Sequence, residues 1–205
     1  MMIAVNRIAM LSSDKELLNS CRSGDIRALE KIYVLYERQV FRYAYHLLGN
    51  RDEADDMKQE TFVKAYQAIA KFRGDSSLQT WLLKICGNLC RDRMKSWDRR
   101  KVQYDSRFDY DGFGSDPHQN DPQMILEKAQ VNETVMKALK GMPAAQREII
   151  VLHEIEDLSH EEISVILSCT RTSVKLRLFR ARKSLRERVH SLLDMNLGKE
   201  EVTTR

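Results

Sequence analysis

The 205-residue sequence has little proline and glycine, with three and eight residues respectively, and few of its segments alternate polar and apolar residues. A sheet protein needs that alternation and frequent turns, so their scarcity argues against strands. No apolar run approaches the roughly 20 residues that cross a bilayer, and the N-terminus lacks the apolar stretch and cleavage site of a secretory signal. We therefore expect an all-α protein that resides in the cytoplasm, with no direct membrane insertion.

The sequence also lacks the residue combinations that perform catalysis. It contains no nucleophile–base motif, no glycine-rich phosphate loop and no cluster of metal ligands. The four cysteines are scattered, although Cys86 and Cys90 are one helical turn apart. Such cysteines in a reducing compartment are usually small buried residues, and a metal site needs about four ligands. We expect no enzyme, no cofactor and no metal; a thiol or metal sensor at Cys86 and Cys90 is a separate alternative.

Charge is abundant but unevenly distributed. Charged residues make up 31% of the chain, yet the net charge is only +4 and the mean hydropathy is −0.50. Residues 98–130 contain two of the three prolines and repeated aspartates, and they have no helical period. This composition predicts an acidic flexible linker, either an ordinary connection or a mimic of nucleic-acid charge. It divides the chain into an N-terminal module (1–97), a C-terminal module (131–195) and a polar, frayed tail (196–205).

Four helical patterns fill the N-terminal module. We predict helices from Ser13 to Arg22, between Asp25 and Gly49, from Arg51 to Ala70 and from Ser77 to Trp97. Asp25 is expected to cap the second helix and Gly49 to end it. These four helices are enough for one compact domain.

The predicted helix at 51–70 has two different faces. The apolar face contains Ala54, Met57, Thr61, Ala65 and Ile69. The opposite face carries Asp52, Asp56, Gln59 and Glu60, with Val63 among them. Acids in a first turn favour the helix dipole, but that effect does not explain a face that extends to Glu60. Because this face would repel DNA, we assign it to a basic protein partner.

The next segment combines aromatic residues, a polar loop and a basic helix. Phe72 precedes the loop from Arg73 to Ser76, and the helix that follows exposes Asn88 and Arg91. This combination is suited to stacking and holding unpaired bases. Composition fits a core role for Phe72 equally well, and Trp81 is expected in the core. Gly87 lies in mid-helix on the predicted outward side, where it costs about 1 kcal/mol relative to alanine. It either permits a close approach of another group or has no special role.

Residues 157–188 predict a helix-turn-helix. Ser159 and Glu162 form a capping box that fixes the start of the first helix. A break at 168–170 follows, and the second helix runs from Arg171 towards Val189. The core stripe of that helix comprises Val174, Leu178, Ala181, Leu185 and Val189.

The rest of that second helix is rich in Arg and Lys, and Glu187 is its only acid. A solvated charged helix is the alternative, but such a helix normally mixes signs for pairing. Leu176 and Phe179 fall opposite the core stripe, where they are suited to contacts with thymine methyls and sugars. The pattern therefore favours a helix that enters the major groove.

Two long segments resemble one known family. Residues 52–92 (DEADDMKQETFVKAYQ…) are similar to the second conserved domain of extracytoplasmic-function sigma factors of bacterial RNA polymerase. Residues 139–189 (LKGMPAAQREIIVLHE…) resemble their fourth domain, in the same order and with a linker between. The resemblance covers nearly the whole chain and implies a promoter-specificity subunit, often serving a stress response.

The resemblance implies roles for the residues singled out above. The face of Asp52, Asp56, Gln59 and Glu60 would dock on the clamp helices of the largest subunit of core RNA polymerase. The minus-ten element of promoter DNA would be held by Phe72, Arg73, Asp75, Ser76, Asn88 and Arg91. The minus-thirty-five element would be read by Arg171, Thr172, Ser173, Lys175, Leu176, Arg177, Phe179 and Arg180. The acidic linker would thread towards the active centre of the polymerase. An anti-sigma factor, often membrane-associated, would cover both domains.

The start of the recognition helix departs from the family pattern. Thr172 and Ser173 stand where the family commonly has Gly-Thr, and Leu176 replaces a small polar residue. A typical minus-thirty-five sequence therefore cannot be transferred to this chain. A helix-turn-helix regulator that acts without joining the polymerase is the alternative function, but it leaves the acidic helix and the segment from Phe72 to Arg91 without a role.

Overall fold

The computed structural model describes residues 16–23, 25–100 and 134–203, with side chains up to residue 97 and from 134 to 194. Most of the predicted linker, the start of the first predicted helix and its expected end at Gly24 lie outside these ranges. Every regular element in the described ranges is helical, which confirms the all-α prediction.

The N-terminal module begins with a helix over residues 16–22, followed by α2 (Ile26–Leu48), α3 (Arg51–Ala68), the 3₁₀ turn η1 (Ile69–Lys71) and α4 (Leu78–Arg100). The side chain of Asp25 accepts a hydrogen bond from the Arg27 amide and caps α2. Gly49 ends α2 with φ +70°, a conformation that favours glycine. The cap of α2 and its end at Gly49 are therefore as predicted.

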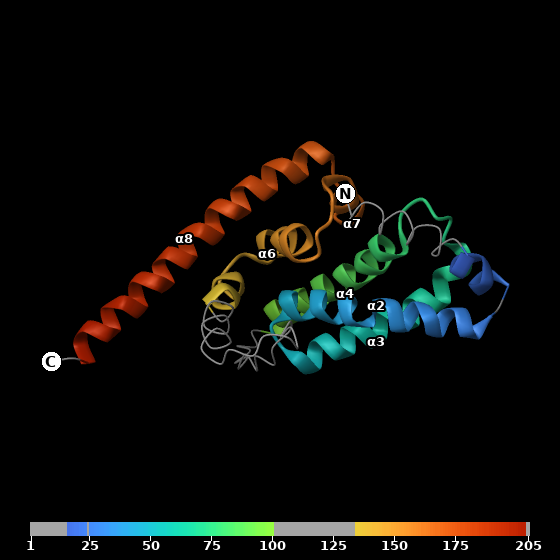
Figure 1. Cartoon of the computed structure of the whole chain (residues 1–205), viewed down its shortest axis with the longest axis horizontal. Helices are drawn as coiled ribbons and strands as arrows, with labels where there is room; N and C mark the ends of the chain where they lie inside the picture. Colours follow the sequence, from blue (N-terminus) through green and yellow to red (C-terminus); the bar gives the residue numbers. More distant parts are fainter. Residues whose placement is uncertain (1–15, 24, 101–133, 204–205) are drawn as a thin grey trace, which may run out of the picture.

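Helices α2, α3 and α4 pack around one core (Figure 1). The predicted apolar face of α3 is buried along its whole length. Thr61, the polar member of that face, donates its hydroxyl to the Met57 carbonyl at 2.6 Å, so its burial leaves no unpaired hydroxyl. The opposite face of α3 consequently points away from the core.

The C-terminal module contains a helix over residues 134–140, α6 (Ala144–Ile150), the π-helical turn η2 (Val151–Ile155), α7 (His160–Ile166) and α8 (Arg171–Thr203). The capping box forms as predicted: the Glu162 amide donates to Ser159 Oγ at 3.3 Å, and the Ser159 amide donates to Glu162 Oε2 at 2.9 Å. Ser168 adopts φ +49° in the break between α7 and α8.

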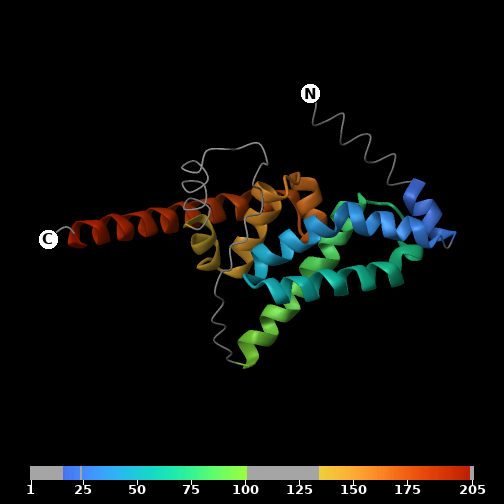
Figure 2. The same ribbon diagram turned by 60° about the horizontal axis from the view of Figure 1, so that its bottom comes forward.

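Helix α8 is longer than predicted. It runs to Thr203, whereas the sequence pattern predicted an end near Val189 and a frayed tail after Asn196. Helix-favouring Leu, Met, Lys and Glu residues continue through this segment and outweigh the cost of Gly198. The far half of α8 extends beyond the module as a rod (Figures 1 and 2), so Leu185 and Val189 are only half-buried.

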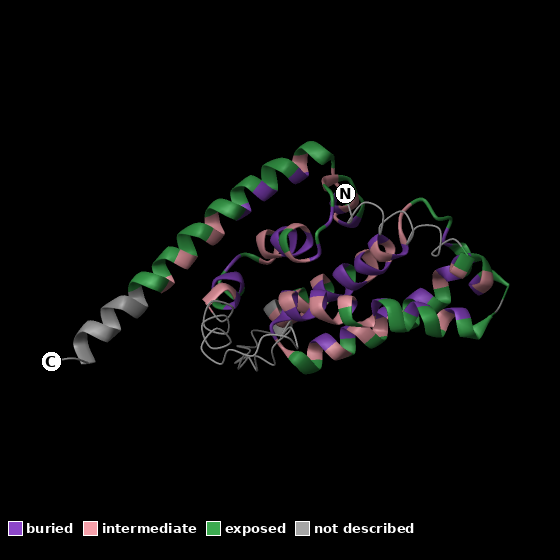
Figure 3. Ribbon diagram, viewed as in Figure 1, coloured by how far each residue is buried: buried purple, intermediate pink, exposed green. Residues whose placement is uncertain are grey.

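The two modules pack directly on each other, which the sequence did not predict. Helix α4 lies against α7, and α2 contacts both η2 and α6. The buried residues of both modules form one continuous cluster, and Figure 3 shows buried segments on the facing sides. Within the described ranges, no helix combines the length and apolar character needed to span a bilayer.

One stability prediction follows from the capping box. We expect Ser159→Ala to lower the free energy of unfolding by about 1 kcal/mol, because α7 loses its N-cap acceptor. Denaturant unfolding followed by circular dichroism would measure this loss. Ser191→Ala, at an exposed position on α8, is the matched control and should stay within about 0.5 kcal/mol of wild type. Equal unfolding curves for the two variants would contradict the role given to the cap.

Candidate nucleic-acid interface

The N-terminal half of α8 is seated in the C-terminal module by its apolar stripe. Val174, Leu178 and Ala181 are buried, as predicted, and α8 packs on both α6 and α7. The hydroxyl of Thr170 accepts a hydrogen bond from the Ser173 amide at 3.2 Å and caps the first turn. These contacts fix which side of α8 faces outward.

The outward side of α8 brings the eight candidate minus-thirty-five residues together. Seven of them are exposed and Ser173 is half-buried. Leu176 is 50% exposed and Phe179 70%, so two apolar side chains stand among the basic ones. From Arg171 to Arg180 the helix spans about 14 Å, at 1.5 Å per residue, which suits insertion into a major groove.

The basic residues of this surface differ in whether they form ion pairs. Arg171 pairs with Glu161 at 2.9 Å. Among the described residues, Lys175, Arg177 and Arg180 form no ion pair. Slight burial and then the positive charges of His153, Lys175, Arg171 and Arg182 lower the pKa of His160. The start of α8 is therefore a locally positive region with unpaired cations, as required for phosphate contacts.

Phe72 lies at the base of the loop that precedes α4. The residue is only 8% exposed, and its ring stacks on Trp81 with 4.6 Å between ring centroids and 23° between planes. The Phe72 carbonyl accepts a hydrogen bond from Arg22. Phe72 thus packs into the core and supports the loop from below, without presenting a free ring face. Trp81 is partly buried against the same core, as expected.

The polar loop from Arg73 to Ser76 projects from the module. Gly74 adopts φ +82° at its tip, and Arg73 pairs with Asp75 at 2.9 Å. Both side chains are more than two-thirds exposed, so this pair contributes little and can be exchanged for other partners. Ser76 is half-buried beside them.

Asn88 and Arg91 lie further along α4, one helical turn apart. Asn88 is exposed and accepts a hydrogen bond from the Arg91 guanidinium through its side-chain oxygen. Asn88 stands about 15 Å along the axis from Leu78, where α4 begins. The minus-ten candidates therefore form an extended surface, as a single strand requires, and not one small pocket.

Arg91 has a second partner that the sequence did not predict. Its guanidinium also donates to Glu148 of α6, which belongs to the other module. Glu148 accepts a further bond from the Tyr43 hydroxyl at 2.9 Å. The pKa of Glu148 is raised, because the effect of burial outweighs the opposing effects of Arg91 and Tyr43. No local pattern identifies this contact, because 57 residues separate Arg91 from Glu148.

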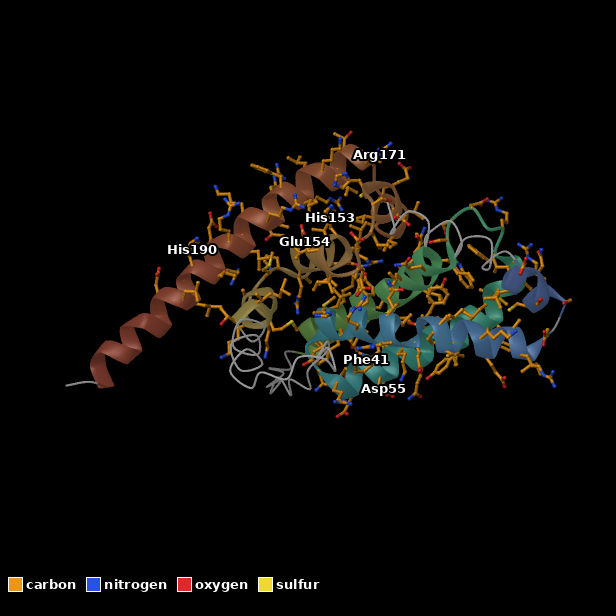
Figure 4. The ribbon with its side chains drawn as sticks, viewed as in Figure 1. Phe41, Asp55, His153, Glu154, Arg171 and His190 are labelled. Carbon is orange, nitrogen blue, oxygen red and sulfur yellow. The ribbon has the colours of Figure 1, made fainter. Side chains whose placement is uncertain are left out.

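Asp52 and Asp56 of the acidic face of α3 line a recess. Asp52, Asp56 and Gln59 are exposed, and Glu60 is half-exposed and pairs with Lys64 at 3.3 Å. The recess has a volume of about 470 Å³ and is lined by Glu37, Arg38, Phe41, Arg51, Asp52, Asp55, Asp56 and Lys58. Sequence reasoning missed its α2 side because that side depends on how α2 packs on α3. Figure 4 shows Asp55 and Phe41 on the opposite side of the molecule from Arg171.

Cys86 and Cys90 lie on the buried side of α4. Both are fully buried, and their sulfur atoms are 3.9 Å apart. The Cys86 thiol and burial raise the pKa of Cys90 well above its ordinary value. A buried, protonated thiol is a poor nucleophile and metal ligand. In the described part of the chain, no group of three or more potential ligands is placed to hold a metal ion.

Two protein-family models match the chain: Sigma-70 region 2 over residues 32–100, and Sigma-70, region 4 over residues 132–185. Among curated proteins, the chain is 30% identical to the RNA polymerase sigma-H factor of Pseudomonas aeruginosa over 184 residues, covering 88% of this chain and 95% of that protein. It is 29% identical to the ECF RNA polymerase sigma-E factor of Escherichia coli K12, covering 88% and 96%.

Two solved structures are also similar to this chain. CnrH in complex with the cytosolic domain of CnrY is similar with a TM-score of 0.62 and 26% identity, covering 89% of this chain and 97% of that one. The sigma factor RpoE in complex with the anti-sigma factor NepR from Bartonella quintana is similar with a TM-score of 0.62 and 26% identity, covering 80% and 98%.

Proposed function

The chain belongs to the extracytoplasmic-function sigma factors of the sigma-70 family, and we propose from this membership how its surfaces divide the work of promoter recognition. As a sigma factor it binds core RNA polymerase and directs it to specific promoters. A regulator that uses only a helix-turn-helix is not favoured, because the region 2 match covers residues 32–100. Sigma factors are initiation factors, and we propose that this chain has no catalytic activity of its own and acts in the cytoplasm.

The exposed N-terminal part of α8 is the observation that supports the proposal most strongly. Lys175, Arg177 and Arg180 would contact phosphates of the minus-thirty-five element and supply affinity that depends on salt. Leu176 and Phe179 would contact thymine methyls and sugars, and with the Thr172-Ser173 entry they would set the sequence preference of this chain. Arg171 and Ser173 complete the surface.

The N-terminal module would act on polymerase and on the melted strand. The acidic face of Asp52, Asp56, Gln59 and Glu60, with the recess beside it, would dock on the clamp helices of the largest polymerase subunit. The loop of Arg73, Asp75 and Ser76 would hold the unpaired minus-ten strand together with Asn88 and Arg91, while Phe72 positions that loop. Modules at 1–97 and 131–195, joined by the linker at 98–130, would place these activities on one chain.

The solved relatives also support an anti-sigma partner. RpoE is bound to the anti-sigma factor NepR, and CnrH to the cytosolic domain of CnrY. We propose that an anti-sigma factor holds this chain inactive and that this partner is membrane-associated. Recovery of the chain in the membrane fraction, and its release when that partner is deleted, would test the membrane association.

Selection from randomised promoter DNA tests the proposed division of roles. Holoenzyme assembled from purified core polymerase and this chain should enrich two sequence boxes, separated by a fixed spacing. Leu176→Ala should alter the upstream box, because only that box would meet α8. Enrichment of a single box, or of the same boxes with core polymerase alone, would contradict the proposal.

A second prediction concerns affinity for duplex DNA. Lys175→Ala and Arg180→Ala should weaken binding of the holoenzyme to the promoter, and each should reduce the slope of log K against log salt by about 1. Lys183→Ala is the matched control, because Lys183 pairs with Glu187 at 3.9 Å and lies beyond the proposed contact surface. Titration of labelled promoter at several salt concentrations measures all three variants. If Lys175→Ala and Arg180→Ala show the same slope as wild type, the proposed phosphate contacts are wrong. All three variants should bind core polymerase like wild type.

A further inference from the structure

Two buried carboxylates of the C-terminal module hold it against the N-terminal module. Glu156, 4% exposed, accepts hydrogen bonds from Arg42 Nε at 2.9 Å, Arg42 Nη2 at 2.6 Å and Gln39 Nε2 at 2.9 Å. Glu148, 3% exposed, accepts from the Tyr43 hydroxyl and from Arg91. The partners lie on α2 and α4, so each carboxylate crosses from one module to the other.

The absence of a side chain at Gly87 leaves space on α4 for the carboxylate of Glu148. A Cβ atom at Gly87 would lie 2.8 Å from the Tyr43 hydroxyl, 3.1 Å from Glu148 Oε1 and 3.3 Å from Arg91 Nη1. The first distance is below any ordinary carbon–oxygen contact, and the other two are tight. Gly87 was expected on the outward side of α4, but it is buried at the module interface. The glycine that weakens this helix therefore makes room for a carboxylate of the other module.

The Glu148 contact occupies Arg91, one of the residues assigned above to the minus-ten strand. Arg91 donates to Glu148 through one guanidinium nitrogen and to the Asn88 side chain through another. A carboxylate and a phosphate present similar oxygen pairs to arginine, so Glu148 takes the place of a backbone phosphate. While Glu148 is bound, the Arg91 guanidinium is engaged with the other module, whereas Asn88 stays exposed and bonds to Arg91 of its own helix.

In the packed arrangement the two modules also lie too close together to reach both promoter elements at once. Elements centred near minus ten and minus thirty-five are about 25 base pairs apart, which is about 85 Å at roughly 3.4 Å per base pair. In the structure α7 of the helix-turn-helix lies directly against α4, which carries Asn88. The two modules must therefore separate on DNA, and the 33 residues 101–133 could span roughly 110 Å when extended.

We propose that Glu148 and Glu156 form an intramolecular latch, which holds the free chain closed and withholds Arg91 from the minus-ten strand until polymerase and promoter open it. The withholding of Arg91 rests on the role proposed above for the minus-ten surface. Buried ion pairs add little net stability, because desolvation of the charges offsets their attraction. Such a latch fixes one arrangement of the modules and still opens readily.

Small-angle X-ray scattering of the free, full-length chain tests the latch without polymerase or DNA. We expect wild type to be compact, and Gly87→Ala and Glu156→Arg each to increase the radius of gyration by several ångströms. Glu154→Arg is the matched charge reversal, because Glu154 pairs with Arg182 inside the C-terminal module and is 42% exposed. This control should scatter like wild type.

Gly87→Ala separates opening from unfolding, because alanine favours the helix more than glycine does. Its helical content by circular dichroism should equal or exceed that of wild type. If both Gly87→Ala and Glu156→Arg are folded and remain as compact as wild type, the latch is overturned, and the sigma function is unaffected by that result. Glu156→Arg keeps the test valid should the alanine variant fail to fold.

Binding of single-stranded DNA tests whether the latch withholds Arg91. The probe is a fluorescent single-stranded oligonucleotide that carries the minus-ten box obtained by promoter selection. Gly87→Ala should bind this probe several-fold more tightly than wild type at the same salt concentration, and Glu154→Arg should not. If the chain opens in solution but its affinity for the probe does not rise, the latch does not withhold Arg91, although promoter-dependent transcription by wild type would stand.

Discussion

Reversing the charge of Asp52 and Asp56 together, as Asp52→Arg with Asp56→Arg, should reduce binding to core RNA polymerase by at least about 100-fold. Both side chains are exposed and line the recess between α2 and α3. Like charges brought together at an interface cost several kcal/mol, and about 2.7 kcal/mol corresponds to a 100-fold loss of affinity. Titration of labelled chain with core polymerase measures the effect directly.

A matched double reversal controls for overall charge. Glu16→Arg with Glu30→Arg changes the same number of charges at exposed positions near the other end of α2. This control should bind core polymerase like wild type. Because Asp52 lies in the first turn of α3, circular dichroism should verify that the helix survives the loss of a favourable dipole contact. Equal binding by the two double variants would show that polymerase docks elsewhere.

Asn88→Ala should slow open-complex formation on the selected promoter by about 10- to 100-fold. The amide of Asn88 offers both a donor and an acceptor to a base, and a good bidentate contact of this kind contributes about 1–3 kcal/mol. Arg91, one turn later, donates a hydrogen bond to the side-chain oxygen of Asn88 and so orients the amide. Permanganate reactivity of unpaired thymines against time measures the opening rate.

The position of Asn88 on an exposed helix face provides the control. Asp92→Ala changes another exposed residue one turn further along α4 and should not slow opening. Both variants should keep wild-type affinity for core polymerase, which separates melting from assembly. If Asn88→Ala forms open complexes at the wild-type rate, the base-capture role assigned to this residue is wrong.

Features set by neighbouring residues could be predicted from the sequence. The capping box of Ser159 and Glu162, the buried stripe of α8 and the buried face of α3 all depend on residues within a few helical turns. Helical period and capping chemistry contain that information directly. The same reasoning indicated that Leu176 and Phe179 face outward, and both are exposed.

Features set by distant residues could not be predicted in this way. Glu148 and Glu156 meet partners 57 to 117 positions away, and no local period reports such contacts. Gly87 was compatible with a close approach to α4 but did not establish one, and it did not identify Glu148. For Phe72, composition fitted a core role and a base-contact role equally, and only the packing on Trp81 showed which face is covered.

The length of α8 was missed for a different reason. Its last residues are polar, and polarity alone suggests fraying at a chain end. Yet this segment contains no proline and many strong helix formers, and the helix continues to Thr203. Helix propensity was therefore a better guide at this position than polarity.

The most direct test of the account is transcription in vitro from a promoter library, with purified core polymerase in the presence and absence of this chain. We predict transcripts that start at defined positions only when the chain is present, that are lost with Asp52→Arg and Asp56→Arg, and that fall sharply with Asn88→Ala. A chain that binds core polymerase but yields no promoter-dependent transcript from any template would contradict its assignment as a sigma factor.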